Sequence, residues 1–173
     1  MTVRVAVLTI SDAGARGERA DTSGDAIVGW VSSLGFTLAA RSLVPDETVA
    51  ITRALAGWAD RGEADLVVTT GGTGLTPRDI TPEATRAVLD REAPGIAEAI
   101  RAEALARFPR AALSRGLAGV RGKTLILNLP GSTGGVNDGL VVLTRWIHHA
   151  VALVRGENTE HDAGTPGRKD PRT

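Results

Sequence analysis

Apolar and polar positions change spacing along the chain in a way that predicts a strand followed by a helix. Residues 3–10 are an almost continuous run of apolar side chains, which is typical of a strand covered on both faces of a parallel sheet. A polar stretch follows. From residue 24 onward, Ile27, Val31 and Leu34 recur at the three- and four-residue intervals of one helical face. The chain therefore begins with a predicted strand, a polar loop and a predicted helix.

The same alternation continues through the rest of the chain. Further strands are predicted at residues 37–44, 65–70 and 124–129, and helices near residues 51–58, 82–90, 95–107 and 136–154. Thr81 is the expected N-cap of the helix near residues 82–90, because Pro82 suits a first helical position. Residues 113–122 carry no pattern that predicts an element. Alternating strands and helices predict an α/β fold, a three-layer α/β/α domain with a mostly parallel central sheet.

The length of the chain predicts one domain and a short tail. A chain of 173 residues is about the size of a single core, since larger chains divide only above roughly 250 residues. Between residues 156 and 173 only Ala163 is apolar, so this stretch buries too little surface to offset its ordering entropy. We expect a folded domain at residues 1–155 and a disordered tail at residues 156–173.

Composition excludes several classes of function. Lys and Arg together number 20 and Asp and Glu number 20, so there is no overall positive field to attract nucleic acid. The chain has no cysteine, which excludes disulfides, thiolate nucleophiles and cysteine-ligated metals. The first residues show no signal-peptide pattern and no apolar run is long enough to span a bilayer. We expect a cytoplasmic protein that binds neither nucleic acid nor membrane.

A glycine-rich segment follows the strand predicted at residues 65–70. Residues 71–79 read GGTGLTPRD, and glycines in such a position let backbone N–H groups approach phosphate oxygens closely. The segment lacks the lysine of a Walker A loop and the third glycine of the dinucleotide fingerprint. An ordinary turn with positive φ is the alternative interpretation. Arg78 and Asp79 favour a site that handles phosphate together with a divalent metal such as Mg²⁺.

Other polar residues follow the remaining predicted strands, at the edge where α/β sheets bind ligands. Asp46 comes after the strand at residues 37–44, where it is either a second carboxylate of the site or the N-cap of the next helix. Residues 11–12, 21–24 and 130–135 are equally open to interpretation, because Asp, Ser and Gly also form caps and turns.

These segments together resemble the MogA/MoaB family of molybdenum cofactor biosynthesis proteins, which includes the G domains of the plant and animal cofactor-synthesis proteins. The resemblance covers about residues 3–154. It is carried by residues 70–74 with 78–85, 44–47, 91–95, 113–115 and 119–122, and it is extended by residues 11–12, 21–24 and 128–131. One departure is Thr133, which stands where many relatives have a second proline after Pro130 and Gly131.

The resemblance implies a homotrimer that binds molybdopterin and, in active members, adenylylates it with ATP and Mg²⁺. Asp46 and Asp79 are the implied catalytic carboxylates, with Asp79 acting through Mg²⁺ and Asp46 orienting the substrates or the metal. A molybdate-insertion protein is an implied partner. The residues implied to bind the substrates are Ser11, Asp12, Ser23, Gly71, Gly72, Thr73, Gly74, Ser114, Gly131 and Ser132.

Two other functions remain open at the level of the sequence. The chain could be a molybdopterin carrier or trimeric scaffold without catalysis, because a fold and a bound ligand do not guarantee chemistry. It could also be a phosphoanhydride hydrolase, as related domains occur in proteins that act on nucleotide pyrophosphates. The identity of the products distinguishes the three.

Overall fold

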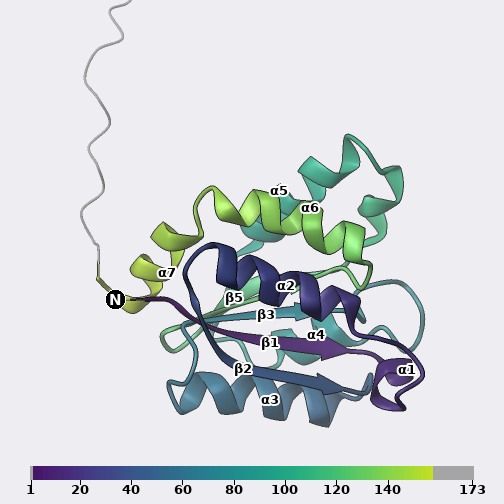
Figure 1. The fold of residues 1–173 in the computed structure, drawn as a ribbon, viewed down its shortest axis with the longest axis horizontal. Helices are drawn as coiled ribbons and strands as arrows, with labels where there is room; N and C mark the ends of the chain where they lie inside the picture. The colour runs from purple at the N-terminus through teal and green to yellow at the C-terminus, as the bar shows by residue number, and fades with distance from the viewer. Residues whose placement is uncertain (1, 158–173) are drawn as a thin grey trace, which may run out of the picture.

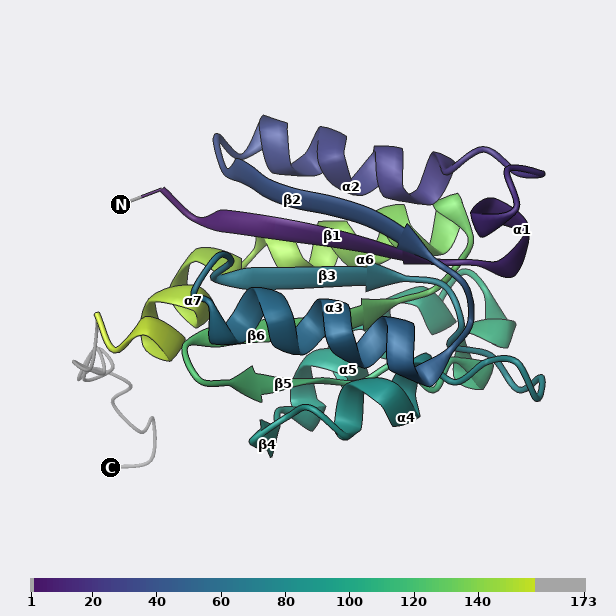
Figure 2. The ribbon, with the colours of Figure 1, turned by 90° about the horizontal axis from the view of Figure 1, so that it is seen from below.

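The structure, a computed structural model, describes residues 2–157 (Figures 1 and 2). The tail predicted at residues 156–173 lies almost wholly outside the described residues, so its disorder stays a prediction. In chain order the elements are β1 (Arg4–Ile10), α1 (Asp12–Ala15), α2 (Thr22–Ser33), β2 (Thr37–Val44), α3 (Thr48–Asp60), β3 (Leu66–Thr70), α4 (Thr81–Arg86), β4 (Arg91–Glu92), α5 (Pro94–Leu105), the 3₁₀ turn η1 (Pro109–Leu113), β5 (Ala118–Arg121), β6 (Thr124–Leu129), α6 (Thr133–Thr144) and α7 (Ile147–Arg155).

The strands form one six-stranded sheet in the order β2-β1-β3-β6-β5-β4. The four longest strands, β2, β1, β3 and β6, are parallel to one another, and β5 and β4 continue the sheet in antiparallel pairs. Figure 1 shows α2, α6 and α7 above the sheet and α3 below it, and α4 packs beside α3. The predicted three-layer α/β/α fold with a mostly parallel sheet is confirmed. None of the helices between residues 2 and 157 is long and apolar enough to cross a membrane.

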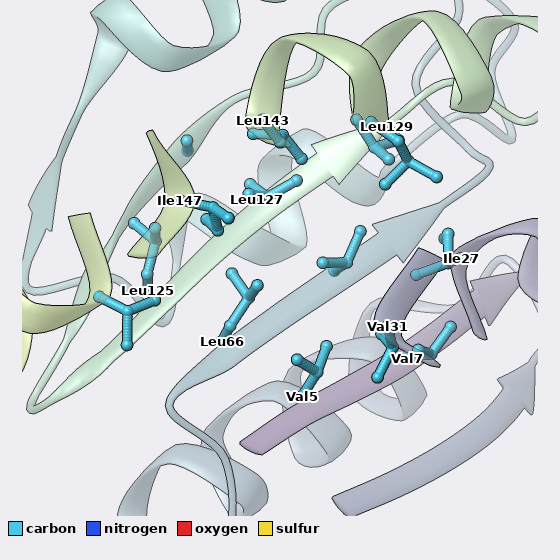
Figure 3. Close-up of a cluster of buried hydrophobic side chains, with 14 of the residues drawn as sticks. Val5, Val7, Ile27, Val31, Leu66, Leu125, Leu127, Leu129, Leu143 and Ile147 are labelled. Carbon is cyan, nitrogen blue, oxygen red and sulfur yellow. The ribbon is translucent and has the colours of Figure 1, made fainter. Parts of the chain in front are cut away.

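The core consists of two apolar layers, one on each face of the sheet. Successive side chains of a strand point to opposite faces, so Val5 and Val7 pack under α2 while Leu8 packs against α3. Figure 3 shows the first layer, in which Val7 lies near the helix residues Ile27 and Val31, and Leu127 lies near Leu143 and Ile147. Because β1, β3 and β6 are buried on both faces, their sequences are almost continuously apolar.

Three expectations about the elements are wrong in detail. The helix predicted at residues 136–154 is two helices, because α6 ends at Thr144 and α7 begins at Ile147. The helix predicted at residues 82–90 ends at Arg86, and Thr81 is its first residue rather than its N-cap. The Thr81 hydroxyl instead donates to the Gly71 carbonyl at 2.9 Å. Tertiary contacts therefore recruit a side chain that local sequence assigns to a cap.

The two antiparallel strands β4 and β5 have no counterpart in the sequence prediction. β4 has two residues, and β5 has four, one of which is Gly119. A Cβ on Gly119 would lie 2.5 Å from the carbonyl oxygen of Arg91, so the glycine permits the close approach of β4. Strands this short show no periodicity, and they form here because β6 offers an edge to pair with.

A buried carboxylate joins the first strand to the last helix. Asp65 accepts hydrogen bonds from the backbone N–H of Arg4 at 2.8 Å and from its guanidinium at 2.7 and 3.1 Å, and it also pairs with Arg155. Burial alone would raise the pKa of Asp65, but these two arginines outweigh burial and lower its pKa to about 2. This depressed pKa means that the ionised carboxylate stabilises the fold at neutral pH.

We expect Asp65→Asn to lower the free energy of unfolding by about 2 kcal/mol at pH 7, since each pKa unit corresponds to about 1.4 kcal/mol. An Asp with a lowered pKa contributes stability above its unfolded value near 4 and loses that contribution as the pH falls through about 2. Urea unfolding at pH 7 and pH 3 should therefore show a smaller difference between variant and wild type at pH 3. Asp60→Asn, which removes an exposed pair with Arg121, is the control. An equal deficit at both pH values would contradict this account.

Candidate active site

A polar cavity of about 380 Å³ lies where the parallel strands end. Ligands of open α/β sheets bind beyond the carboxyl ends of the strands, so the cavity stands where the topology predicts it. Its walls come from the loops after β1, β2, β3 and β6 and from the loop before α2. The lining residues are Thr9, Ile10, Ser11, Gly14, Arg19, Ala20, Asp21, Thr22, Ser23, Leu43, Asp46, Thr70, Gly71, Gly72, Asp79, Gly131 and Ser132.

Two glycines bring the loops of this cavity together. Gly71 and Gly72 have φ of +98° and +64°, a region that side chains with a Cβ rarely adopt. A Cβ on Gly71 would lie 2.1 Å from the carbonyl oxygen of Ile10, and one on Gly72 would lie 2.9 Å from a carboxylate oxygen of Asp46. The turn with positive φ is therefore present, and it also presses the β3 loop against the loops after β1 and β2.

Asp46 is held by a reciprocal pair of hydrogen bonds with Asp12. The Asp12 N–H donates to the Asp46 carboxylate at 2.9 Å, and the Asp46 N–H donates to the Asp12 carboxylate at 3.0 Å. The N-cap interpretation of Asp46 is wrong, because Glu47 occupies the cap position of α3. Burial raises the pKa of Asp46, and the nearby charges of Asp12 and Asp79 add to the increase. The Asp46 side chain therefore faces the cavity rather than a helix end.

Asp79 is fixed by the loop in which it lies. The N–H and hydroxyl of Thr76 donate to its carboxylate at 2.8 and 2.6 Å. Burial would raise the pKa of Asp79, but the hydrogen bonds from Thr76 and Gly74 and the charge of Arg115 together lower it. Asp79 is thus stabilised as an anion.

Arg115 positions this loop from outside the cavity. Its guanidinium donates to the Gly74 carbonyl at 2.7 Å, to the Asp79 carbonyl and to the Glu83 carboxylate. Our sequence reasoning assigned Arg115 no role, although it stands in a segment that carries the family resemblance. Its partners lie more than 30 positions away in the chain, so only the folded structure shows them.

The substrate-binding residues predicted from the sequence divide into three groups. Ser11, Ser23, Gly71, Gly72, Gly131 and Ser132 line the cavity. Asp12, Thr73 and Gly74 are not among the lining residues, and Asp12 forms an ion pair with Arg78 at 2.8 Å. Ser114 lines a different cavity. The hydroxyls of Ser11 and Ser132 accept from backbone N–H groups of Gly14 and Gly135, so both residues also serve as helix caps.

The second cavity, of about 390 Å³, adjoins the first at Ser132. Its lining includes the apolar side chains of Ile100, Phe108 and Pro130 and the hydroxyl-bearing Ser114, together with the charged residues Arg101, Arg110 and Asp138. Residues 130–135 separate the two cavities. Thr133, which departs from the usual family pattern, shares a hydrogen bond of 2.9 Å with the Thr22 hydroxyl and so ties α6 to α2 at the rim.

Two charged cavity residues, Asp21 and Arg19, were not among the predicted substrate-binding residues, although Asp21 belongs to the segment 21–24 that the sequence left open between a site and a cap. The Asp21 carboxylate caps α2 by accepting from the Gly24 N–H at 2.9 Å, and it also accepts from the Thr9 hydroxyl. The cap interpretation of this residue is therefore confirmed, and its side chain also lines the cavity. Its charge is paired with Arg41 at 2.8 Å. Arg19 lies in the polar loop between α1 and α2, and nothing in the sequence distinguished it from its neighbour Arg16.

Comparison with known proteins identifies the family. A family model described as "Probable molybdopterin binding domain" matches residues 6–149. The chain belongs to this family. The resemblance to the MogA/MoaB proteins is therefore confirmed, and it holds for the solved structures as well. The crystal structure of the molybdopterin biosynthesis enzyme MoaB from Thermus thermophilus is 53% identical, with a TM-score of 0.86, over 92% of this chain and 100% of that chain.

Curated members of the family differ in how much of their length the chain spans. The molybdopterin adenylyltransferase of Helicobacter pylori strain J99 is 40% identical over 160 residues, which are 90% of this chain and 89% of that protein. The molybdenum cofactor synthesis protein cinnamon of Drosophila melanogaster is 42% identical over 154 residues, but the chain spans only 26% of its length. The chain thus matches most of a bacterial enzyme and one part of a larger protein.

Proposed function

We propose that this protein is a molybdopterin adenylyltransferase of molybdenum cofactor biosynthesis. The observation that carries the proposal is that Asp46 and Asp79 line one cavity together with the glycines of the β3 loop. The Helicobacter pylori relative, which bears that name and matches along nearly its whole length, supports it.

In this reaction an oxygen of the terminal phosphate of molybdopterin attacks the α-phosphorus of ATP. A bond from that oxygen to the α-phosphorus forms, the bond to the bridging oxygen breaks, and pyrophosphate leaves with the electron pair.

The residues of the chain suit a reaction between two polyanions. Such a transfer needs no covalent nucleophile, because catalysis consists of positioning the phosphates and neutralising charge. Gly71 and Gly72 line the cavity without a side chain, so phosphate groups can approach the backbone there. The reciprocal Asp12–Asp46 hydrogen bonds and the Thr76–Asp79 contacts hold both carboxylates in place before substrate arrives.

The donor set in the cavity fits Mg²⁺. Among residues 2–157 no three histidine, cysteine or carboxylate side chains cluster as they would to hold a metal ion by themselves. Mg²⁺ that is bound together with phosphates needs only one or two carboxylates, and Asp46 and Asp79 line the cavity. We assign metal binding to Asp79, whose anionic form is stabilised, and orientation of the substrates or metal to Asp46. Magnesium, when bound, would neutralise phosphate charge in the transition state.

The two cavities suggest a division between the parts of the substrates. We assign the phosphates to the polar cavity with Ser11, Ser23 and Gly131. The second cavity offers apolar surface and the Ser114 hydroxyl, which suit the pterin ring, and Ser132 contributes to both cavities. A homotrimer, a cytoplasmic location and contact with a molybdate-insertion protein are further proposals that follow from the family resemblance.

Purified protein mixed with molybdopterin, ATP and Mg²⁺ is expected to form adenylyl-molybdopterin and pyrophosphate in a single turnover. Mass spectrometry of the quenched mixture identifies the product directly, and omission of molybdopterin is the control. Bound pterin without product would contradict the proposal and favour a carrier or scaffold. Pyrophosphate released from ATP in the absence of pterin would also contradict it, and would indicate a phosphoanhydride hydrolase.

A further inference from the structure

Arg19 is the one positively charged side chain that lines the polar cavity within residues 2–157. It lies in the loop between α1 and α2, three residues before α2 begins at Thr22. Within the same part of the chain, no carboxylate lies at ion-pair distance from Arg19, whereas its neighbour Arg16 is paired with Glu18 at 2.8 Å. The guanidinium of Arg19 is therefore exposed and available to a ligand.

The other arginines around the cavity are committed to the protein itself. Arg78 forms two hydrogen bonds with the Asp12 carboxylate, at 2.9 and 2.8 Å. Arg41 bridges Asp21 at 2.8 Å and Asp25 at 2.7 Å. Arg115 holds the loop that contains Asp79 through two backbone carbonyls. Each of these would have to break existing contacts before it could bind a phosphate, and Arg19 would not.

The cavity carries more negative than positive charge without a ligand. Asp46 and Asp79 line it with no cation at ion-pair distance among residues 2–157, and one metal ion at Asp79 would offset part of that charge. A nucleoside triphosphate adds about four negative charges of its own near pH 7. A cation from the protein would offset more of this charge, and a guanidinium can form two parallel hydrogen bonds with a phosphate.

We propose that Arg19 binds the β- and γ-phosphates of ATP and then the pyrophosphate that leaves. This inference rests on the proposed adenylyltransferase function. Asp79 lies on the loop after β3, while Arg19 lies on the loop before α2, so the two belong to different walls of the cavity. The positive charges that act on the Asp46 and Asp79 carboxylates come from Arg78 and Arg115. Arg19 is thus placed to hold the leaving group from another loop than the one that carries the carboxylate that we assign to the metal.

The test compares inhibition of the full-length enzyme by magnesium pyrophosphate and by AMP. In Arg19→Ala the inhibition constant for pyrophosphate should rise about tenfold or more, because charge-assisted hydrogen bonds are lost. The inhibition constant for AMP, which lacks the β- and γ-phosphates, should change less than about twofold. The KM for ATP should rise together with the inhibition constant for pyrophosphate. Arg19→Lys should recover part of the affinity, since it keeps the charge without the planar fork.

Arg16→Ala is the matched control, because Arg16 lies on the same loop, is exposed and does not line the cavity. It should leave both inhibition constants unchanged. Equal pyrophosphate affinity in wild type and Arg19→Ala, or equal losses for pyrophosphate and AMP, would overturn the inference. Calorimetry with magnesium pyrophosphate alone separates this result from the proposed function, since binding is measured whether or not the wild-type protein forms adenylyl-molybdopterin.

Discussion

Asp79→Asn is expected to lower the single-turnover rate of adenylyl-molybdopterin formation by at least about 100-fold, because the substitution removes a negative charge assigned to the metal. The amide oxygen of Asn can still accept the hydrogen bonds that Thr76 donates, so the loop should keep its shape. Asp46→Asn should reduce the rate comparably, since an amide oxygen can still accept from the Asp12 N–H but carries no charge. Quenched-flow analysis of the product measures both variants.

A magnesium titration distinguishes the two carboxylates. In Asp79→Asn the Mg²⁺ concentration needed for half-maximal rate should increase, whereas in Asp46→Asn the maximal rate should fall with a smaller change in that concentration. Asp60→Asn, whose carboxylate pairs with Arg121 outside the cavity, serves as the control for a lost surface charge. Full turnover in both cavity variants would contradict the assignment of Asp46 and Asp79 as catalytic residues.

Gly71→Ala is expected to lower the free energy of unfolding by about 3 kcal/mol or more and to abolish activity. The new Cβ would lie 2.1 Å from the Ile10 carbonyl oxygen, and φ at this position is +98°. The clashing atom belongs to the backbone, so the loops after β1 and β3 would have to move apart, and no flexible side chain could give way instead. For a chain of this size the melting temperature should fall by about 10 °C.

Gly29→Ala is the matched control for this change. Gly29 lies in α2 without a positive φ, and a Cβ added there would have no atom within 4 Å, so alanine should leave stability unchanged or raise it slightly. Calorimetric melting of both variants, together with the single-turnover assay, gives the comparison. A Gly71→Ala protein that melts like the wild type would show that the β3 loop tolerates a side chain.

The spacing of apolar residues was sufficient to predict the four parallel strands and most of the helices. Val5, Val7 and their counterparts in β3 and β6 belong to strands that are buried on both faces, and this produces continuous apolar segments that are visible without a structure. The position of the site followed from the same pattern, since the polar loops come after these strands. The prediction of the two carboxylates came from the family resemblance, because composition alone favoured a helix cap for Asp46.

The sequence by itself therefore determined the fold class and the edge of the sheet where we predicted the site, because strand and helix periods depend on local spacing, and its motifs determined the family. Only the tertiary structure decided which polar groups pair. Three features depend on how the fold brings their segments together: the Asp12–Asp46 hydrogen bonds, the hydrogen bonds from Arg115 to the loop that contains Asp79, and the pairing of β5 with β6. The same applies to Arg19, whose availability to a ligand depends on where the fold places every neighbouring carboxylate of residues 2–157.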